Sequence, residues 1–250
     1  MGERGGIRLM AGIAAVAACL LLSDCAPEAA STSPSPIAAT PTPKGSPSQK
    51  CPSSEGGVCL GEVPAGTYST KSFRPRLTYT VPDGWSNLED LPGNFLLVPP
   101  AYSLEGVNAG TSDYIGVYAS VVPAMNCESE APPGVERSPA AIVDWLSGHP
   151  GLVLESQVVS VGGLDGMMAE MRVAPDWTEG CSYSNGRPIV PFLTGRPPSA
   201  FDHNLPEGQA IRLYLLSSGT DVLGIEVLDV ADAQHFDEYQ FVVDAFAFDG

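Results

Sequence analysis

The sequence contains three histidines, and their neighbours indicate what chemistry each could support. His235 lies three residues after Asp232 and three before Glu238, on a segment expected to be helical, so the three side chains would share one face. Such a trio could hold a cation weakly, but an ordinary solvated acidic face gives the same pattern, and we expect no metal there. His149 lies in a Gly-His-Pro sequence that is typical of a helix exit.

The third histidine belongs to a long segment, 174–209, which is the best candidate for a ligand site. Six prolines interrupt this segment and only 189–193 shows periodicity, so we expect mainly a long loop. Long loops in compact domains often carry function. The side chains that could face a ligand are Trp177, Tyr183, Arg187, Arg196 and His203. The alternative is that Cys181 tethers a surface excursion whose aromatic side chains pack against the domain.

No catalytic motif accompanies these residues. The chain lacks a Gly-x-Ser-x-Gly elbow, a His-Glu-x-x-His pair, a Walker loop and a Gly-x-Gly-x-x-Gly sequence. We therefore expect no cofactor and name no catalytic residue. Two function classes stay open: a non-catalytic binding module, and a secreted hydrolase that uses the 174–209 segment. A deep cleft in which His203 meets a serine or aspartate would favour the enzyme, and a shallow aromatic patch would favour binding.

The N-terminus indicates export. Arg4 and Arg8 form a short positive region, and the apolar run that ends at Leu22 is shorter than the roughly 20 residues of a spanning helix. This arrangement is typical of a signal peptide. It resembles the signal of bacterial lipoproteins, in which the run ends at the cysteine that receives the lipid. The resemblance implies removal of residues 1–24 and attachment of the protein to the outer face of the cell membrane.

Two cysteines compete for the lipid. Cys25 is better placed, although Asp24 departs from the small residue that the pattern prefers before the cysteine. Cys19 follows a better local match but would leave three leucines in the mature chain. We expect lipidation at Cys25; simple cleavage without lipid is the remaining alternative.

Residues 25–63 are expected to form a disordered tether. Ser, Thr, Pro, Ala and Gly dominate, so the segment has too few large apolar side chains to offset the entropy of ordering it. Its prolines keep it extended, and its Ser and Thr residues could carry O-linked sugars. The net charge of −17 excludes nucleic acid as a partner, because phosphate binding requires basic surface. The expected partners are the membrane, through the lipid, and a protein, glycan or small-molecule ligand.

Four cysteines remain after lipidation, which favours disulfides in an exported chain. Pairing Cys51 with Cys59 closes a short loop that turns easily, and leaves Cys127 to pair with Cys181. We expect this pairing, on the hypothesis that the strands before Cys127 and Cys181 run in the same direction. The competing arrangement joins Cys51 or Cys59 to Cys181.

Residues 64–250 are expected to form one globular α+β domain, a mainly antiparallel sheet covered by two or more helices. Alternation of apolar residues and turn sequences predicts strands at 77–81, 95–98 and 114–122, hairpins of 157–161 with 167–173 and of 211–216 with 222–228, and helices from Ser138 and from about Ala231.

The sequence from Tyr79 to Trp85 (Tyr-Thr-Val-Pro-Asp-Gly-Trp) resembles the first-strand motif of the Mog1/PsbP-like group. The closing helix that runs into 242–248 resembles the end of the same group. Small actinobacterial lipoproteins share this organisation of signal, Pro/Ser tether, domain and terminal helix. The resemblance implies an α/β/α sandwich, but it implies no particular function, because members of the group do unlike things.

Overall fold

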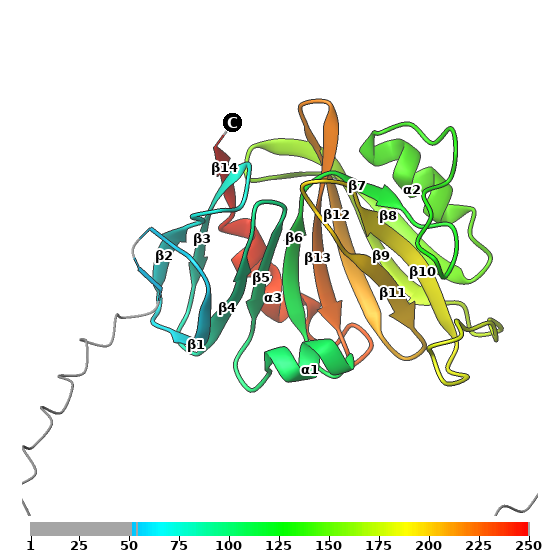
Figure 1. Ribbon diagram of the computed structural model, residues 1–250, viewed down its shortest axis with the longest axis horizontal. Coiled ribbons are helices and arrows are strands. Elements are labelled where there is room, and N and C mark those ends of the chain that lie inside the picture. Colours follow the sequence, from blue (N-terminus) through cyan, green and yellow to red (C-terminus); the bar gives the residue numbers. More distant parts are fainter. Residues whose placement is uncertain (1–51, 54, 250) are drawn as a thin grey trace, which may run out of the picture. The chain divides into compact units, whose positions relative to one another are not determined.

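The computed structural model describes residues 52–53 and 55–249, and its centre is an eight-stranded sheet (Figure 1). Every neighbouring pair in this sheet is antiparallel. The strands run in the order β1 (Cys59–Val63), β4 (Trp85–Asp90), β5 (Asn94–Val98), β6 (Tyr114–Tyr118), β13 (Asp221–Asp229), β12 (Ala210–Ser218), β9 (Leu164–Val173) and β8 (Leu152–Val161). The expected α+β class with a mainly antiparallel sheet is confirmed.

Two small sheets and three helices surround the central sheet. One small sheet contains β14 (Ala247–Asp249), β3 (Arg76–Val81) and β2 (Gly66–Ser69), and the other contains β11 (Asp202–Pro206), β10 (Ile189–Gly195) and β7 (Val121–Pro123). The helices are α1 (Leu104–Ala109), α2 (Pro139–Ser147) and α3 (Phe236–Asp244). None of these helices is long and apolar enough to cross a membrane.

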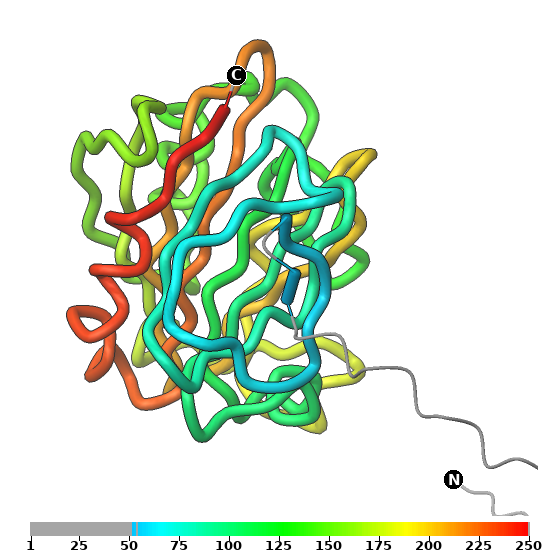
Figure 2. The backbone as a smooth tube through the Cα atoms, turned by 90° about the vertical axis from the view of Figure 1, so that its left-hand side faces the viewer, coloured from blue at the N-terminus to red at the C-terminus, as the bar shows by residue number. Residues whose placement is uncertain are grey.

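The central sheet separates two hydrophobic cores because its middle strands bury both of their faces. In β5, Phe95 and Leu97 join the core that contains α3 and β3, whereas Leu96 and Val98 join the core that contains α2, β10 and β11. Successive strand residues point to opposite faces, so a continuous apolar run supplies both cores at once. Figure 2 shows the result, with the red α3 on one side and the yellow 189–206 hairpin on the other.

Local signals explain where α2 and α3 begin. Ser138 accepts a hydrogen bond from the Ala141 amide at 3.3 Å, and Pro139 occupies the first turn of α2, as expected. The helix expected to begin near Ala231 is α3, which begins at Phe236. The loop before it has two residues with left-handed backbone, Asp232 (φ 59°) and Ala233 (φ 71°), which cannot belong to a right-handed helix.

The folded domain begins earlier than the expected boundary at 64. Strand β1 belongs to the central sheet, and both Cys59 and Val63 are 1% exposed. The buried carboxylate of Asp90 accepts four backbone N–H bonds, from Gly57 before β1 and from 71–73 before β3. These bonds fasten the start of the domain to β4. The expected signal peptide, Cys25, Cys51 and most of the expected tether lie outside the described residues.

The 174–209 segment is mostly loop and turn, as expected, but it also contains the hairpin of β10 and β11. Pro191 lies inside β10, at an irregularity in the register with β11. Proline has no backbone N–H to donate to a neighbouring strand, but it is tolerated where the register is irregular. The prolines therefore argued against a strand in the sequence but do not prevent one in the structure.

Candidate functional site

The disulfide between Cys127 and Cys181 is present, with 5.6 Å between the two Cα atoms, and this pairing is confirmed. The geometric reason given for it was wrong. Three antiparallel steps separate β6 from β9, so these strands run in opposite directions. Cys127 reaches Cys181 because the chain leaves the central sheet after β6 and its next strand, β7, pairs with β10, with Pro123 opposite Leu193. Cys59 is also disulfide-bonded, and the Cys51 expected as its partner lies outside the described residues.

The disulfide borders a pocket of about 360 Å³. Three segments build it: the stretch after β7, the exit of α2, and the first part of the 174–209 segment. Its lining residues are Met125, Asn126, Cys127, Glu128, His149, Trp177, Glu179, Gly180, Cys181, Ser182, Ile189 and Pro191. The bond therefore joins two of the three segments, and holds them in place without secondary structure.

Trp177 and His149 form the aromatic part of this pocket. Their rings meet edge to face, with 5.4 Å between the centroids. The Trp177 indole N–H donates to the carbonyl of Ile189 at 3.2 Å, which fixes the ring against β10. The ring also packs so closely on Gly151 that a Cβ there would lie 2.7 Å from it. Glycine is therefore required at 151 to admit the indole.

The pocket is acidic and offers hydrogen-bond acceptors more than cations. Glu128 and Glu179 are exposed at its edge, and no lysine or arginine is among the lining residues. Burial lowers the pKa of His149, and the charge of Glu179 only partly opposes this shift. The Gly151 amide donates to Nδ1 of His149 at 3.0 Å, so the neutral ring carries its proton on Nε2. An anion finds little attraction here, whereas a neutral or cationic ligand with an apolar face finds a ring and several acceptors.

The other four residues proposed from the sequence are not among the residues that line this pocket. Tyr183 is 52% exposed and donates to Asn204. Arg187 donates to the backbone carbonyl of Glu207, and Arg196 lines a separate hollow beside α2. His149, which the sequence places at the exit of a helix, also lines the pocket. Nothing in the local sequence indicates which segment packs over that exit.

His203 lies on β11 and faces the central sheet. Its Nδ1 lies 2.5 Å from a carboxylate oxygen of Glu226, which is 1% exposed and also accepts from Tyr114 at 2.5 Å. Burial, together with the charge of Glu226, raises the pKa of Tyr114. Burial also raises the pKa of nearby Glu89, against the opposing effect of His203. Phe201 covers the imidazole, with 4.4 Å between ring centroids.

This arrangement orients an imidazole as a catalytic base would be oriented. Among the described residues, however, no serine, threonine or cysteine side chain is hydrogen-bonded to His203, and His203 lines neither the pocket beside the disulfide nor the hollow beside α2. The cluster's clear effect is to join the β11 hairpin to β13.

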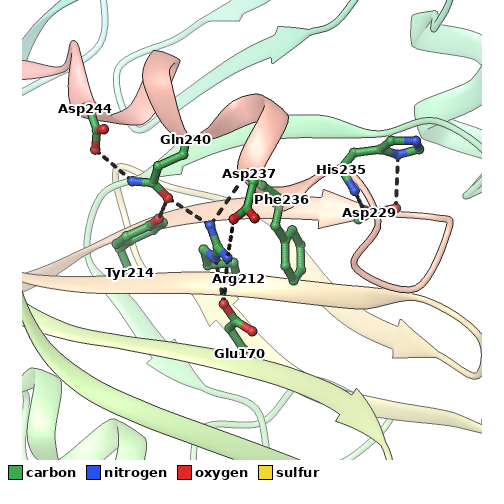
Figure 3. Close-up of polar contacts among 9 residues, drawn as sticks. All are labelled: Glu170, Arg212, Tyr214, Asp229, His235, Phe236, Asp237, Gln240 and Asp244. Atoms are coloured by element: carbon green, nitrogen blue, oxygen red, sulfur yellow. Dashed lines mark hydrogen bonds and ion pairs between the residues drawn. The ribbon is translucent and has the colours of Figure 1, made fainter.

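A third polar cluster involves His235, but with partners other than those expected. Its Nδ1 lies 2.9 Å from Asp113 and 3.4 Å from Asp229, and both carboxylates are fully buried; Figure 3 shows the Asp229 contact. The expected neighbour Asp232 instead pairs with Arg172. The donor atoms of Asp113, Asp229 and His235 are close enough to hold a metal ion. Every oxygen of the two aspartates nevertheless accepts a hydrogen bond already, from backbone amides, Tyr239 or His235. The cluster therefore fits the role of organising the loop before α3.

The polar residues below α3 hold that helix on the sheet (Figure 3). Arg212 of β12 pairs with Glu170 at 2.7 Å, donates to Gln240 at 2.9 Å, and lies 4.9 Å from the ring centre of Phe236. The neighbouring Glu170 raises the pKa of this guanidinium, although burial acts in the opposite direction. The polar groups of Arg212 find their partners within the protein, so their role is to hold α3 against the sheet.

Comparison with known proteins adds little beyond the fold class. No family model and no curated protein matches the chain. The chain is similar to the cyanobacterial PsbP protein CyanoP from Synechocystis, with 10% identity and a TM-score of 0.37, over 77% of this chain and 98% of that one. It is also similar to a crystal structure from Bacteroides thetaiotaomicron, with 11% identity and a TM-score of 0.34, over 70% of this chain and 45% of that one.

Proposed function

We propose that this protein is an extracytoplasmic binding module, anchored to the membrane by a lipid on Cys25, which binds a glycan or a small polar molecule in the pocket beside the Cys127–Cys181 bond. The resemblance to the Mog1/PsbP-like lipoproteins belongs to this proposal. The observation that carries it is the pocket itself, because a disulfide, an indole and an imidazole converge there from three separate segments.

The composition of the pocket indicates the class of ligand. Trp177 offers an amphipathic aromatic surface, and Asn126, Ser182 and the two glutamates offer groups that match hydroxyl or amino donors. The rigid support of the indole by Gly151 and Ile189 favours binding, because little side-chain entropy is then lost when a ligand arrives.

The test is binding of a panel of soluble neutral and amino-substituted oligosaccharides, followed by ligand-observed NMR and by tryptophan fluorescence. We expect Trp177→Ala to weaken binding at least ~10-fold, since truncation of a central aromatic residue in a binding site commonly costs about 2 kcal/mol or more. Tyr183→Ala is the matched control, because Tyr183 is an exposed aromatic residue of the same segment outside the pocket. Equal loss in the two variants, or no binding of any probe, would contradict the proposal.

The alternative of a hydrolase is favoured by one observation, the hydrogen bond between His203 and the buried Glu226. It predicts that the protein cleaves esters, amides or glycosides in a panel of chromogenic substrates, and that His203→Gln abolishes cleavage while His149→Gln does not. If the wild-type protein cleaves none of the substrates, the His203 cluster is structural.

A further inference from the structure

The two edges of the central sheet differ in how well they are protected from pairing with another strand. At one edge, β1 has only five residues, and its register is irregular between Cys59 and Glu62. At the other edge, β8 has ten residues in unbroken register with β9, and within the described part of the chain it pairs with β9 alone. It contains no proline, lysine or arginine. Proteins usually protect sheet edges from pairing with short strands, irregular register, prolines or charged side chains. Of these features β8 has only one, the charged residue Glu155.

The β8 edge also exposes apolar side chains on both faces of the sheet. Six of its ten residues are exposed, including Val153 (51%) and Val158 (79%). Because side chains alternate along a strand, these two valines point to opposite faces. A covering helix could bury one of them but not both. An added strand, which continues both faces, could bury both.

We infer that β8 pairs antiparallel with β8 of a second copy of this chain, about a two-fold axis that passes beside Ser156, so that two central sheets become one. The inference is independent of the ligand pocket. The sequence of the strand is complementary to itself in this register. Leu154 lies opposite Val158 of the second copy, and Val153 lies opposite Val159 of the second copy. Each exposed valine thereby meets an apolar partner, and the symmetry produces each contact twice.

The only charged residue of the strand also fits this register. Glu155 lies opposite Gln157 of the second copy, so a carboxylate meets an amide donor and not another carboxylate. The neighbouring symmetric register, centred on Gln157, is less favourable. It places Leu154 opposite Ser160 and Val158 opposite Ser156, and so separates the apolar pairs. The opposing influence is the net charge of −17 on each chain, which predicts that added salt strengthens the pairing.

The test is cysteine cross-linking of the full-length protein in membranes and in detergent solution. In the inferred register Ser156 lies opposite Ser156 of the second copy. The Cα atoms of these two serines would be about 4.5–5.5 Å apart, which is within the range for a disulfide. Ser156→Cys should therefore give a dimer on a non-reducing gel after mild oxidation. Ser160→Cys is the matched control, since the two symmetry-related residues would lie many residues apart along the paired strands.

A second pair of variants tests the contact without a new cysteine. In analytical ultracentrifugation, Val158→Lys should convert the dimer into a monomer. Phe241→Lys, which changes an exposed residue of α3, should leave the dimer unchanged. Both side chains are exposed, so neither change should impair folding. Raising the salt concentration from about 0.05 to about 0.5 M should increase the dimer fraction of the wild type. A monomeric wild type, equal cross-linking at 156 and 160, or preferential cross-linking through Gln157→Cys would overturn the inferred pairing.

Discussion

Replacing Asp90 by asparagine should destabilise the domain more than any other conservative change at its entrance. Asp90 is only 4% exposed, and each oxygen of its carboxylate accepts hydrogen bonds from two backbone amides. One oxygen accepts from Gly57 (3.0 Å) and Lys71 (2.6 Å). The other accepts from Ser72 (2.9 Å) and Phe73 (2.8 Å). In asparagine, one oxygen becomes an amide donor, so two backbone donors lose their acceptor whichever way the side chain is placed. Hydrogen bonds to a charged group contribute about 1.5–3 kcal/mol each, so the expected loss is roughly 3–6 kcal/mol.

The assay is thermal and urea unfolding of the full-length protein and of Asp90→Asn. A loss of that size corresponds to a midpoint lower by about 6–24 °C, since about 1 kcal/mol shifts a domain of this size by roughly 2–4 °C. Asp83→Asn is the matched control. Its carboxylate accepts one exposed amide, from Ala65 at 2.7 Å, and the change removes the same charge. The reasoning is refuted if the two variants unfold within about 2 °C of one another.

Three further predictions concern the anchor, the pocket and the disulfide. Cys25→Ser should release the protein from the membrane fraction, and continued binding of this variant with release of Cys19→Ser would reverse the assignment. Because burial lowers the folded-state pKa of His149 below its usual 6.5, the unfolded chain binds a proton first on acidification. His149 therefore favours the folded state above about pH 6.5, and this contribution to stability is lost as the pH falls from there to the folded-state pKa. Asparagine does not titrate in this range, so the unfolding midpoint of His149→Asn should fall less between about pH 7.5 and 5.5 than that of the wild type. Removing the disulfide, which spans a sequence separation of 54 residues, by joint replacement of Cys127 and Cys181 with serine should cost about 4 kcal/mol in unfolding experiments and weaken ligand binding; unchanged stability would show that packing alone holds the two segments.

Sequence reasoning predicted the parts of the candidate site unevenly. It selected Trp177, which lines the candidate pocket, and it paired Cys127 with Cys181, although the strand directions assumed for that pairing were wrong. It did not find His149 or Gly151, which reach the pocket only because the exit of α2 packs against the 174–209 segment. It grouped His203 with Trp177, whereas β11 turns that histidine toward Glu226, 23 residues further along the chain.

What the sequence alone determined is local: the alternation that makes the strands at 95–98 and 211–216, the serine and proline that start α2, and the Gly162–Gly163 turn between β8 and β9. Each depends on the conformational preferences of a few adjacent residues, so each is visible in a short window. The tertiary structure alone decided that β6 lies beside β13, that β7 pairs with β10 outside the central sheet, and that Tyr114 contacts Glu226 across 112 residues. These choices depend on how apolar faces and buried polar groups from distant segments satisfy one another at the same time, and no short window contains that information.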